Sequence, residues 1–518
     1  MVKKFPLSSF KKWLFISVLF TFSNAFSANF YVNDNSTAGD VYCTAVGDDT
    51  NNGTSPATPK LTLNAAYAAA APGDTIFIDT GTYTGSGNVS LIFNKSITIK
   101  GAGTLKTIFT SHTDDRFGTI SANDVHIEGL QLFDFFLETS STVLGQVILV
   151  NSNITGFELT NVVMKKNYGS TNDGASIHLS SGSSSTFKGL FFSCSGFNGG
   201  SGGAVKINAA TLNLKNSVFS QSRDAAGYGG ALDIIGASNV IIDKCTFDGN
   251  SAYAGGAIAQ FGGSLAVTNS CFNRNYISGD SSANTNGGGH YYSTGTITSA
   301  SFTNCKFEGA YFCATTNPSG YPCQYSTNVS NDGNAISIRG AAGNFTFDTC
   351  DFNNSNQPNA NFDNGLDFYL DKSATISVNI TNCKFANDMW GGTGSGGSDA
   401  VNIWNEDLSS AEFIVTNSGT KQTTANQDGT VGNNYSYAGT APSGDNLTQT
   451  SSTNVSCVSG FVGCSAVVNC ATETNAPIII SCAPDQTLSS CTGTLPDYRP
   501  LLSVFDDSVK KYGQEIND

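Results

Sequence analysis

The sequence predicts an all-β protein, a right-handed single-stranded parallel β-helix with an N-terminal cap and a small C-terminal β segment. A corner of Gly-Gly-Ala and one apolar residue recurs at 202–205, 229–232 and 255–258. A phenylalanine follows each corner in a polar setting, within 216–219, 243–250 and 269–275. Self-similarity with a period of roughly 26 to 34 residues indicates a solenoid in which each repeat forms one coil.

Strands rather than helices form these coils, because the repeats alternate apolar and polar residues and are interrupted by Gly, Asn, Asp and Ser. Each strand is expected to pair with its equivalent one coil away, at about 4.8 Å. Glycine is expected at the corners, where positive φ and close backbone approach exclude a side chain. About eleven or twelve coils predict a monomeric rod on the order of 55 Å long.

Stacked coils place like residues over one another in ladders. The repeats predict an internal aromatic column of Phe219, Phe247, Phe272, Phe307, Phe352 and Phe385. The Asn residues that often follow these phenylalanines are expected to donate amide hydrogen bonds from coil to coil.

The N-terminus predicts export. Lysines at 3, 4, 11 and 12 precede an apolar run at 13–22 and then small residues, which is the layout of a signal peptide over 1–27. The run is too short to cross a membrane, so we expect no transmembrane segment and an extracellular or outer cell surface location. Residues 28–90 are predicted to form the N-terminal cap and the first strands, with a short Leu/Ala-rich helix that ends at Pro72 and covers the first coil.

The remaining chain is divided by composition. Residues 91–421 are predicted to form the parallel β-helix. Residues 422–456 are rich in Thr, Ser, Asn and Gly and predict a linker. Residues 457–518 contain five cysteines and predict a disulfide-rich segment.

Two resemblances accompany this division. The Gly-Gly-Ala-Ile and Phe-x-x-Asn repeats over roughly 170–410 resemble those of chlamydial polymorphic outer-membrane proteins, which implies a surface-exposed β-helix. Residues 475–487 and 495–498 resemble the opening strands of a HYR domain, an immunoglobulin-like module of extracellular proteins, over about half the length of such a module.

The cysteines divide into two groups. Cys245, Cys305, Cys350 and Cys383 stand two residues before a column phenylalanine, which places them inside the helix, where a ladder of reduced thiols is favoured over disulfides. Cys313 and Cys323 flank an apparent loop, and a local disulfide is expected there. Cys482 and Cys491 are the disulfide candidates of the C-terminal segment.

Charge and composition exclude several functions. The formal charge is −15, which argues against a nucleic-acid partner. Four histidines without metal-ligand spacing predict neither a zinc site nor a Ser-His-Asp arrangement. No cofactor is expected, and Ca²⁺ stays possible without a motif that supports it.

One alternative is enzymatic. The segment from Phe30 to Tyr83 looks like the start of many secreted β-helix proteins, polysaccharide lyases among them. A lyase that acts on a uronate-containing polysaccharide by β-elimination needs a base near the sugar C5 proton. The candidate bases are Lys206, Arg223, Lys244 and Arg274, although an inter-coil salt bridge with Asp233 explains Lys206 without catalysis.

The favoured function is binding. Two residues beyond the first outward position of their strands lie Phe261, Arg339, Tyr369 and Trp404. They predict an outward stripe that stacks on sugar rings of an extended polymer or anchors a protein partner. Packing beneath the insertions near 279–286 or 318–330 explains the same residues equally well. The sequence therefore predicts an exported adhesin or extracellular glycan-binding protein, whose partner is a polysaccharide or a host or cell-surface molecule, and leaves catalysis open.

Overall fold

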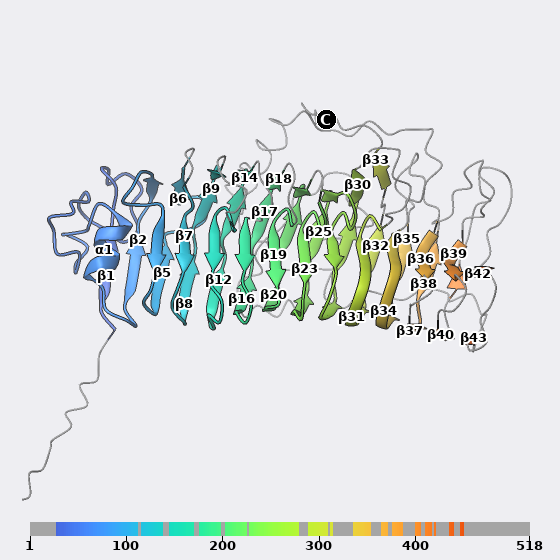
Figure 1. Ribbon diagram of the computed structural model, residues 1–518. Helices are drawn as coiled ribbons and strands as arrows, with labels where there is room; N and C mark the ends of the chain where they lie inside the picture. The colour runs from blue at the N-terminus through green and yellow to red at the C-terminus, as the bar shows by residue number, and fades with distance from the viewer. Residues whose placement is uncertain are drawn as a thin grey trace, which may run out of the picture.

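The chain folds into a rod of stacked coils. The computed structural model describes residues 27–111, 115–137, 144–169, 176–197, 202–224, 227–278, 288–308, 311–313, 335–353, 364–370, 375–386, 399–405, 410–416, 419–420, 435–439 and 446–449. Strands of neighbouring coils pair in parallel along the rod (Figure 1). The predicted parallel β-helix is thereby confirmed.

Each complete coil passes through four ladders of strands, which we number in the order in which the chain visits them. The first ladder comprises β4 (Leu91–Phe93), β7 (Gly118–Ile120), β11 (Ile148–Val150), β15 (Ile177–Leu179), β19 (Val205–Asn208), β23 (Leu232–Ile235), β27 (Ile258–Gln260), β31 (Tyr291–Thr303), β34 (Ile336–Asp348), β36 (Asn364–Leu370), β39 (Asp399–Asn405) and β42 (Tyr435–Gly439). The second ladder comprises β1 (Asn29–Val32), β2 (Thr75–Ile78), β5 (Ile97–Gly101), β8 (Val125–Glu128), β12 (Phe157–Thr160), β16 (Ser184–Lys188), β20 (Thr211–Lys215), β24 (Asn239–Asp243), β28 (Ser264–Thr268), the later parts of β31 and β34, β37 (Thr375–Thr381), β40 (Ser410–Thr416) and β43 (Asn446–Gln449).

The other two ladders are built of shorter strands. The third ladder comprises β3 (Gly81–Tyr83), β6 (Thr107–Thr110), β9 (Gln131–Phe133), β13 (Val163–Lys165), β17 (Phe191–Ser193), β21 (Val218–Ser220), β25 (Thr246–Asp248), β29 (Cys271–Asn273), β32 (Lys306–Glu308), β35 (Asp351–Asn353), β38 (Lys384–Ala386) and β41 (Gly419–Thr420). The fourth ladder comprises β10 (Phe136–Leu137), β14 (Tyr168–Gly169), β18 (Gly196–Phe197), β22 (Arg223–Asp224), β26 (Ser251–Ala252), β30 (Tyr276–Ser278) and β33 (Tyr311–Cys313).

The second ladder is longer than the sequence suggests. In the described part of the chain it contains fourteen strands, where about eleven or twelve coils are expected. At the N-terminal end β1 already pairs with β2 inside the segment assigned to the cap. At the other end β42 and β43, inside the segment assigned to a linker, pair with β39 and β40. The two described strands within this polar segment therefore add backbone hydrogen bonds to the rod.

A short helix closes the N-terminal end. Helix α1 (Leu63–Ala69) begins after the N-cap Thr62, whose hydroxyl accepts a hydrogen bond from the Ala65 amide. Leu63 and Ala66 are fully buried, and the Tyr67 ring packs edge-on against Phe93 at 5.5 Å. This apolar face covers the first coils, as the Leu/Ala-rich sequence predicts.

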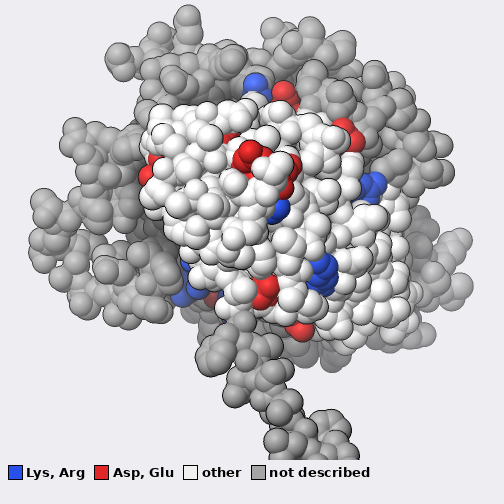
Figure 2. Space-filling view, turned by 90° about the vertical axis from the view of Figure 1, so that its left-hand side faces the viewer, with Lys and Arg blue, Asp and Glu red and all other residues white. Residues whose placement is uncertain are grey.

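The view onto the N-terminal end of the rod shows scattered charges of both signs on a mostly uncharged surface (Figure 2).

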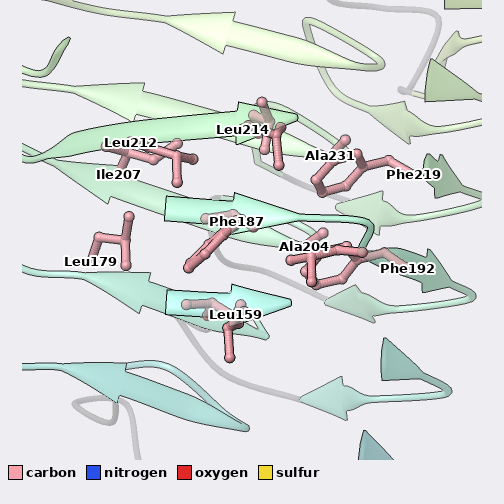
Figure 3. Close-up of a cluster of buried hydrophobic side chains, with 14 of the residues drawn as sticks. Leu159, Leu179, Phe187, Phe192, Ala204, Ile207, Leu212, Leu214, Phe219 and Ala231 are labelled. Atoms are coloured by element: carbon pink, nitrogen blue, oxygen red, sulfur yellow. The ribbon is translucent and has the colours of Figure 1, made fainter. Parts of the chain in front are cut away.

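The interior is a continuous apolar column. Leu159, Phe187 and Leu214 project into it from the second ladder, opposite Leu179 and Ile207 of the first (Figure 3). The described rings of the predicted phenylalanine column, Phe219, Phe247, Phe272, Phe307 and Phe352, stack with centroids 4.7 to 5.2 Å apart. Phe192, which the prediction does not include, stacks on Phe219 at 4.7 Å. The backbone register extends this column to Phe385. Truncation of one such ring is expected to cost about 3 to 5 kcal/mol.

The glycine corners behave as the sequence predicts. Gly229 has φ of 68° and Gly255 has φ of 65°, a region that L-residues with a side chain rarely adopt. A Cβ on the following residue, Gly230, would clash with the carbonyl oxygens of Gly256 and Ser251 in the next coil. The first glycine therefore supplies the backbone conformation, and the second allows neighbouring coils to approach.

At other corners, buried asparagine side chains form hydrogen bonds between neighbouring coils. The Asn250 amide donates to the Phe219 carbonyl at 2.9 Å, and Asn275 donates to Phe247 at the same distance. Each links one coil to its neighbour, as predicted for the Asn residues after the phenylalanines.

The predicted column of buried cysteines also lies at a corner, directly before the strands of the third ladder. Cys350 lies within hydrogen-bond distance of the Phe302 and Asp348 carbonyls, at 3.4 and 3.5 Å. Ser217 and Ser270 stand in this column on other coils and donate to the carbonyls two residues before them. Burial raises the pKa of Cys350. In the described part of the chain Cys245, Cys305, Cys350 and Cys383 are buried free thiols.

Candidate functional site

The outer face of the first ladder combines polar, charged and aromatic side chains. Strand alternation points Val205 and Ile207 inward and Lys206 outward. On the neighbouring coils the position of Lys206 is taken by His178 and Asp233. Although this row faces away from the core, it is largely withdrawn from solvent, since Lys206 is 6% and Asp233 1% exposed. By contrast, Ile92 of β4, which stands in the same row, is 61% exposed.

The salt bridge expected between two coils is present. The Lys206 Nζ lies 3.9 Å from Asp233 Oδ2, across the pairing of β19 with β23. Both side chains are buried, so breaking this pair would leave a charge in a poorly solvated site. The structure therefore supports a structural role for Lys206.

Four aromatic rings from neighbouring coils form a cluster beside this row. We call Tyr228, Tyr253, Phe261 and Tyr292 the aromatic cluster. Tyr228 lies at its centre, with ring centroids 4.8 Å from Phe261, 6.0 Å from Tyr253 and 6.2 Å from Tyr292. Tyr292 is buried, whereas the other three are partly exposed. The cluster therefore exposes parts of three rings to solvent, and these rings pack with the buried ring of Tyr292.

Charged groups flank the aromatic cluster on both sides. Burial, followed by Tyr253 and the Asp233 carboxylate, raises the pKa of Tyr228. Burial also raises the pKa of Tyr292, while the Thr294 hydroxyl and the Arg339 guanidinium act in the opposite direction. Arg339 Nε donates to the Ser337 hydroxyl at 3.3 Å. Both tyrosines therefore keep their hydroxyl protons at neutral pH and can donate hydrogen bonds.

The backbone register gives the positions of the predicted stripe residues along the first ladder. Arg339 pairs with Tyr369, and Tyr369 with Trp404, on three successive coils. Phe261 directly follows Gln260, which pairs with Ser293, so it stands one coil before Thr294, the partner of Arg339. Phe261 and Arg339 are partly exposed. The side chains of Tyr369 and Trp404, and the insertions suggested as a cover, lie outside the described part of the structure.

The four candidate bases of a lyase stand on different parts of the coil. Lys206 is in the first ladder and Arg223 in the fourth. Lys244 occupies the corner after the second ladder with φ of 54°, and Arg274 the corner after the third with φ of 50°. Arg274 also forms a bidentate pair with Asp248, at 2.6 and 3.0 Å. The structure does not bring these residues together.

The described residues give little indication of other ligands. They contain no group of three or more His, Cys, Asp or Glu side chains arranged to hold a metal ion. Among them no helix is long and apolar enough to cross a membrane. Of the disulfide candidates, Cys313 ends β33, and Cys323, Cys482 and Cys491 fall outside the described ranges, as does nearly all of the predicted signal peptide.

Solved structures with similar folds include a glucanase, an alginate lyase and a phage tailspike protein. A GH87 alpha-1,3-glucanase catalytic domain in complex with nigerose aligns with a TM-score of 0.36 and 15% identity, over 74% of this chain and 67% of that one. A PL6 family alginate lyase aligns with a TM-score of 0.38 and 13% identity, over 72% and 52%. Tailspike protein 3 of bacteriophage CBA120 aligns with a TM-score of 0.36 and 12% identity, over 74% and 58%.

These likenesses are too distant to carry an argument about activity. No protein-family model and no curated protein matches the chain. The resemblance of the repeats to chlamydial polymorphic outer-membrane proteins is not shown, and the HYR-like segment lies beyond the described residues. Function therefore has to be argued from the outer face itself.

Three members of the aromatic cluster are not among the site residues predicted from the sequence. Tyr228 and Tyr253 stand just before the glycine corners at 229 and 255, and Tyr292 follows the Gly-Gly-Gly at 287–289. An aromatic residue beside successive corners is a readable signal. To find this signal, one has to align the glycine corners of successive repeats as well as their strands.

Proposed function

We propose that this protein is an exported β-helix protein that binds an extracellular glycan on the outer face of its first ladder. The aromatic cluster is the observation that carries the proposal. It joins three neighbouring coils beside the first ladder and contains three partly exposed rings in contact with one another or with Tyr292. Preorganised aromatic rings lose little conformational freedom on binding and stack well on the apolar faces of sugars.

Polar groups beside the cluster supply orientation. Tyr228 and Tyr292 keep their hydroxyl protons, and Arg339 and Ser337 lie on the next coil. The guanidinium group can donate hydrogen bonds to sugar hydroxyls, and hydroxyl and phenol groups can both donate to and accept from them. A mainly aromatic site with a few placed polar groups is the composition expected of a small-ligand surface.

Attachment to cells or surfaces follows from this activity. A monomeric rod with a predicted signal peptide would carry the site outside the cell, as an adhesin or a soluble glycan-binding protein. The acidic chain, at −15, favours solubility and disfavours a nucleic-acid partner.

The proposal is tested by retention on a polysaccharide panel. Purified protein is incubated with cellulose, chitin, mannan, xylan, alginate and polygalacturonate, and the bound fraction is measured with and without Ca²⁺. We expect retention on at least one polymer, weakened about three- to tenfold in Tyr228→Ala because one stacking ring is lost. Absorbance near 232 nm, recorded in the same samples, reports any unsaturated uronate.

A matched control separates stacking from general damage. Tyr31 is also partly exposed and stacks on Phe77 at 5.6 Å, but it lies on β1 at the N-terminal end. Tyr31→Ala should leave retention unchanged. Absence of retention on every polymer, or equal loss in both variants, would contradict the proposal, and rising absorbance would favour a lyase.

A further inference from the structure

Three ionisable side chains gather on the outer face of the third ladder, away from the proposed binding face. In β32 and β35 the rings of Phe307 and Phe352 point into the core and stack at 4.7 Å. Alternation along the two strands therefore places Lys306, Glu308 and Asp351 on the outer face. All three are nevertheless withdrawn from solvent, since Lys306 is 5%, Glu308 1% and Asp351 8% exposed.

The backbone register brings these three groups close to one another. Lys306 pairs directly with Asp351 of the next coil, and equivalent residues of paired parallel strands lie about 4.8 Å apart. Glu308 stands two residues farther along the strand of Lys306, and its Oε2 lies 2.9 Å from the Lys306 Nζ. On the other neighbouring coil Lys306 pairs with Cys271, which carries no carboxyl group. Lys306 is therefore flanked by one carboxyl group across the ladder and by a second along its own strand.

Burial of these charges is costly. An ion pair that is withdrawn from water loses hydration free energy, which the attraction between its partners recovers only in part. Condensation of the Lys306 amine with the Asp351 carboxyl group replaces two buried charges with one neutral amide. Burial therefore shifts the balance toward the amide, whereas water favours the separate ions.

We propose that Lys306 and Asp351 are joined by an intramolecular isopeptide bond and that Glu308 carries the protons of this reaction. Glu308 accepts a proton from the Lys306 ammonium group, and the free amine attacks the Asp351 Cγ. The Nζ–Cγ bond forms as one Cγ–Oδ bond breaks. Two of the three ammonium protons leave with that oxygen as one molecule of water, and the charge of Glu308 is unchanged at the end. Adjacent paired strands supply the proximity that the reaction needs.

The Lys206–Asp233 pair provides an internal comparison. It also joins a buried lysine to an aspartate at the paired position of the next coil, with Nζ 3.9 Å from Oδ2. Two residues farther along these strands stand Asn208 and Ile235, neither of which has a carboxyl group that could accept a proton. We therefore expect Lys206 and Asp233 to remain an ion pair.

Mass spectrometry of the purified full chain tests the bond. The folded protein is denatured and digested, and each fragment is compared with the mass calculated from the sequence. We expect the peptides that contain Lys306 and Asp351 to be recovered joined, with a combined mass lower by one molecule of water. Fragmentation should place the link between these two residues. Recovery of the two peptides separately and unmodified would overturn the proposal.

Conservative variants test the role of each group. Lys306→Arg keeps the positive charge but has no nucleophilic amine, so the link should not form. Glu308→Gln keeps the shape of the side chain but cannot accept the proton, so the linked fraction at equal times should fall roughly tenfold or more. Lys206→Arg is the matched control and should keep the link in full.

Circular dichroism of each variant shows whether it is folded, so that a missing link in a folded variant reports lost chemistry. Joined peptides in Lys306→Arg would overturn the assignment of the amine. Equal rates of linking in wild type and Glu308→Gln would overturn the role of Glu308.

Discussion

Individual buried polar residues carry much of the specificity of this fold. His290 is fully buried and packs against the stacked rings of Phe272 and Phe307, and its Nδ1 lies 3.0 Å from the Asn275 amide nitrogen. Because an amide NH₂ can only donate, Nδ1 accepts and Nε2 carries the proton. Burial lowers the pKa of His290 to about 3. This imidazole therefore stays neutral in the folded protein well below the pH at which an exposed histidine is charged.

His290 should make stability depend on pH. The unfolded chain takes up a proton on this residue below about pH 6.5, and the folded protein does so only near pH 3. Folding stability is therefore complete above pH 6.5 and falls as the pH drops toward 3, by roughly 1.4 kcal/mol per unit. We expect wild-type protein to lose about 2 to 3 kcal/mol more than His290→Gln between pH 7 and 4.5. Urea unfolding at both pH values measures this, and equal losses would contradict the burial of a neutral histidine.

At the scale of strands and corners, the sequence predicts what repeats and fails where a residue departs from the repeat. The corners at 229 and 255, the phenylalanine column and the Lys206–Asp233 pair follow from two-residue alternation and a constant period. Lys244 and Arg274 could not be placed in this way, because corner residues with positive φ are usually Asn or Gly. The ring contacts of Tyr228 could not be predicted from its own repeat either, since its neighbours come from other coils.

The asparagine links between coils should contribute strongly to stability. Asn250 donates to the Phe219 carbonyl and the Asn275 amide oxygen, each at 2.9 Å, and accepts from the Ser222 amide at 3.0 Å. Asn250→Ala leaves these buried partners unsatisfied and is expected to cost about 2 to 4 kcal/mol. Asn239→Ala, at an exposed strand position, should change stability by less than about 0.5 kcal/mol. Chemical denaturation compares the two, and a similar small loss in both would show that the links are not important.

At the scale of the whole molecule, the rod separates structural and binding roles by face. The interior and most corners serve stacking, whereas the first ladder adds an outer surface of rings and polar groups on rigid strands. The aromatic cluster spans three neighbouring coils, which suits a polymer better than a compact ligand. The fold class is predictable from the sequence because it needs only periodicity. The position of the site requires contacts between residues such as Tyr228 and Phe261 that only the assembled coils create.

The most direct test is hydroxyl-radical footprinting of the wild-type protein with and without the polysaccharide that retains it. Tyr228, Tyr253 and Phe261 are partly exposed in the free protein, as are Tyr31 and Tyr42 at the N-terminal end. We expect the glycan to lower oxidation of the first three severalfold and to leave the two N-terminal tyrosines unchanged. Protection at Tyr31 and Tyr42 instead, or no protection of the aromatic cluster under saturating glycan, would contradict the assignment of the binding face.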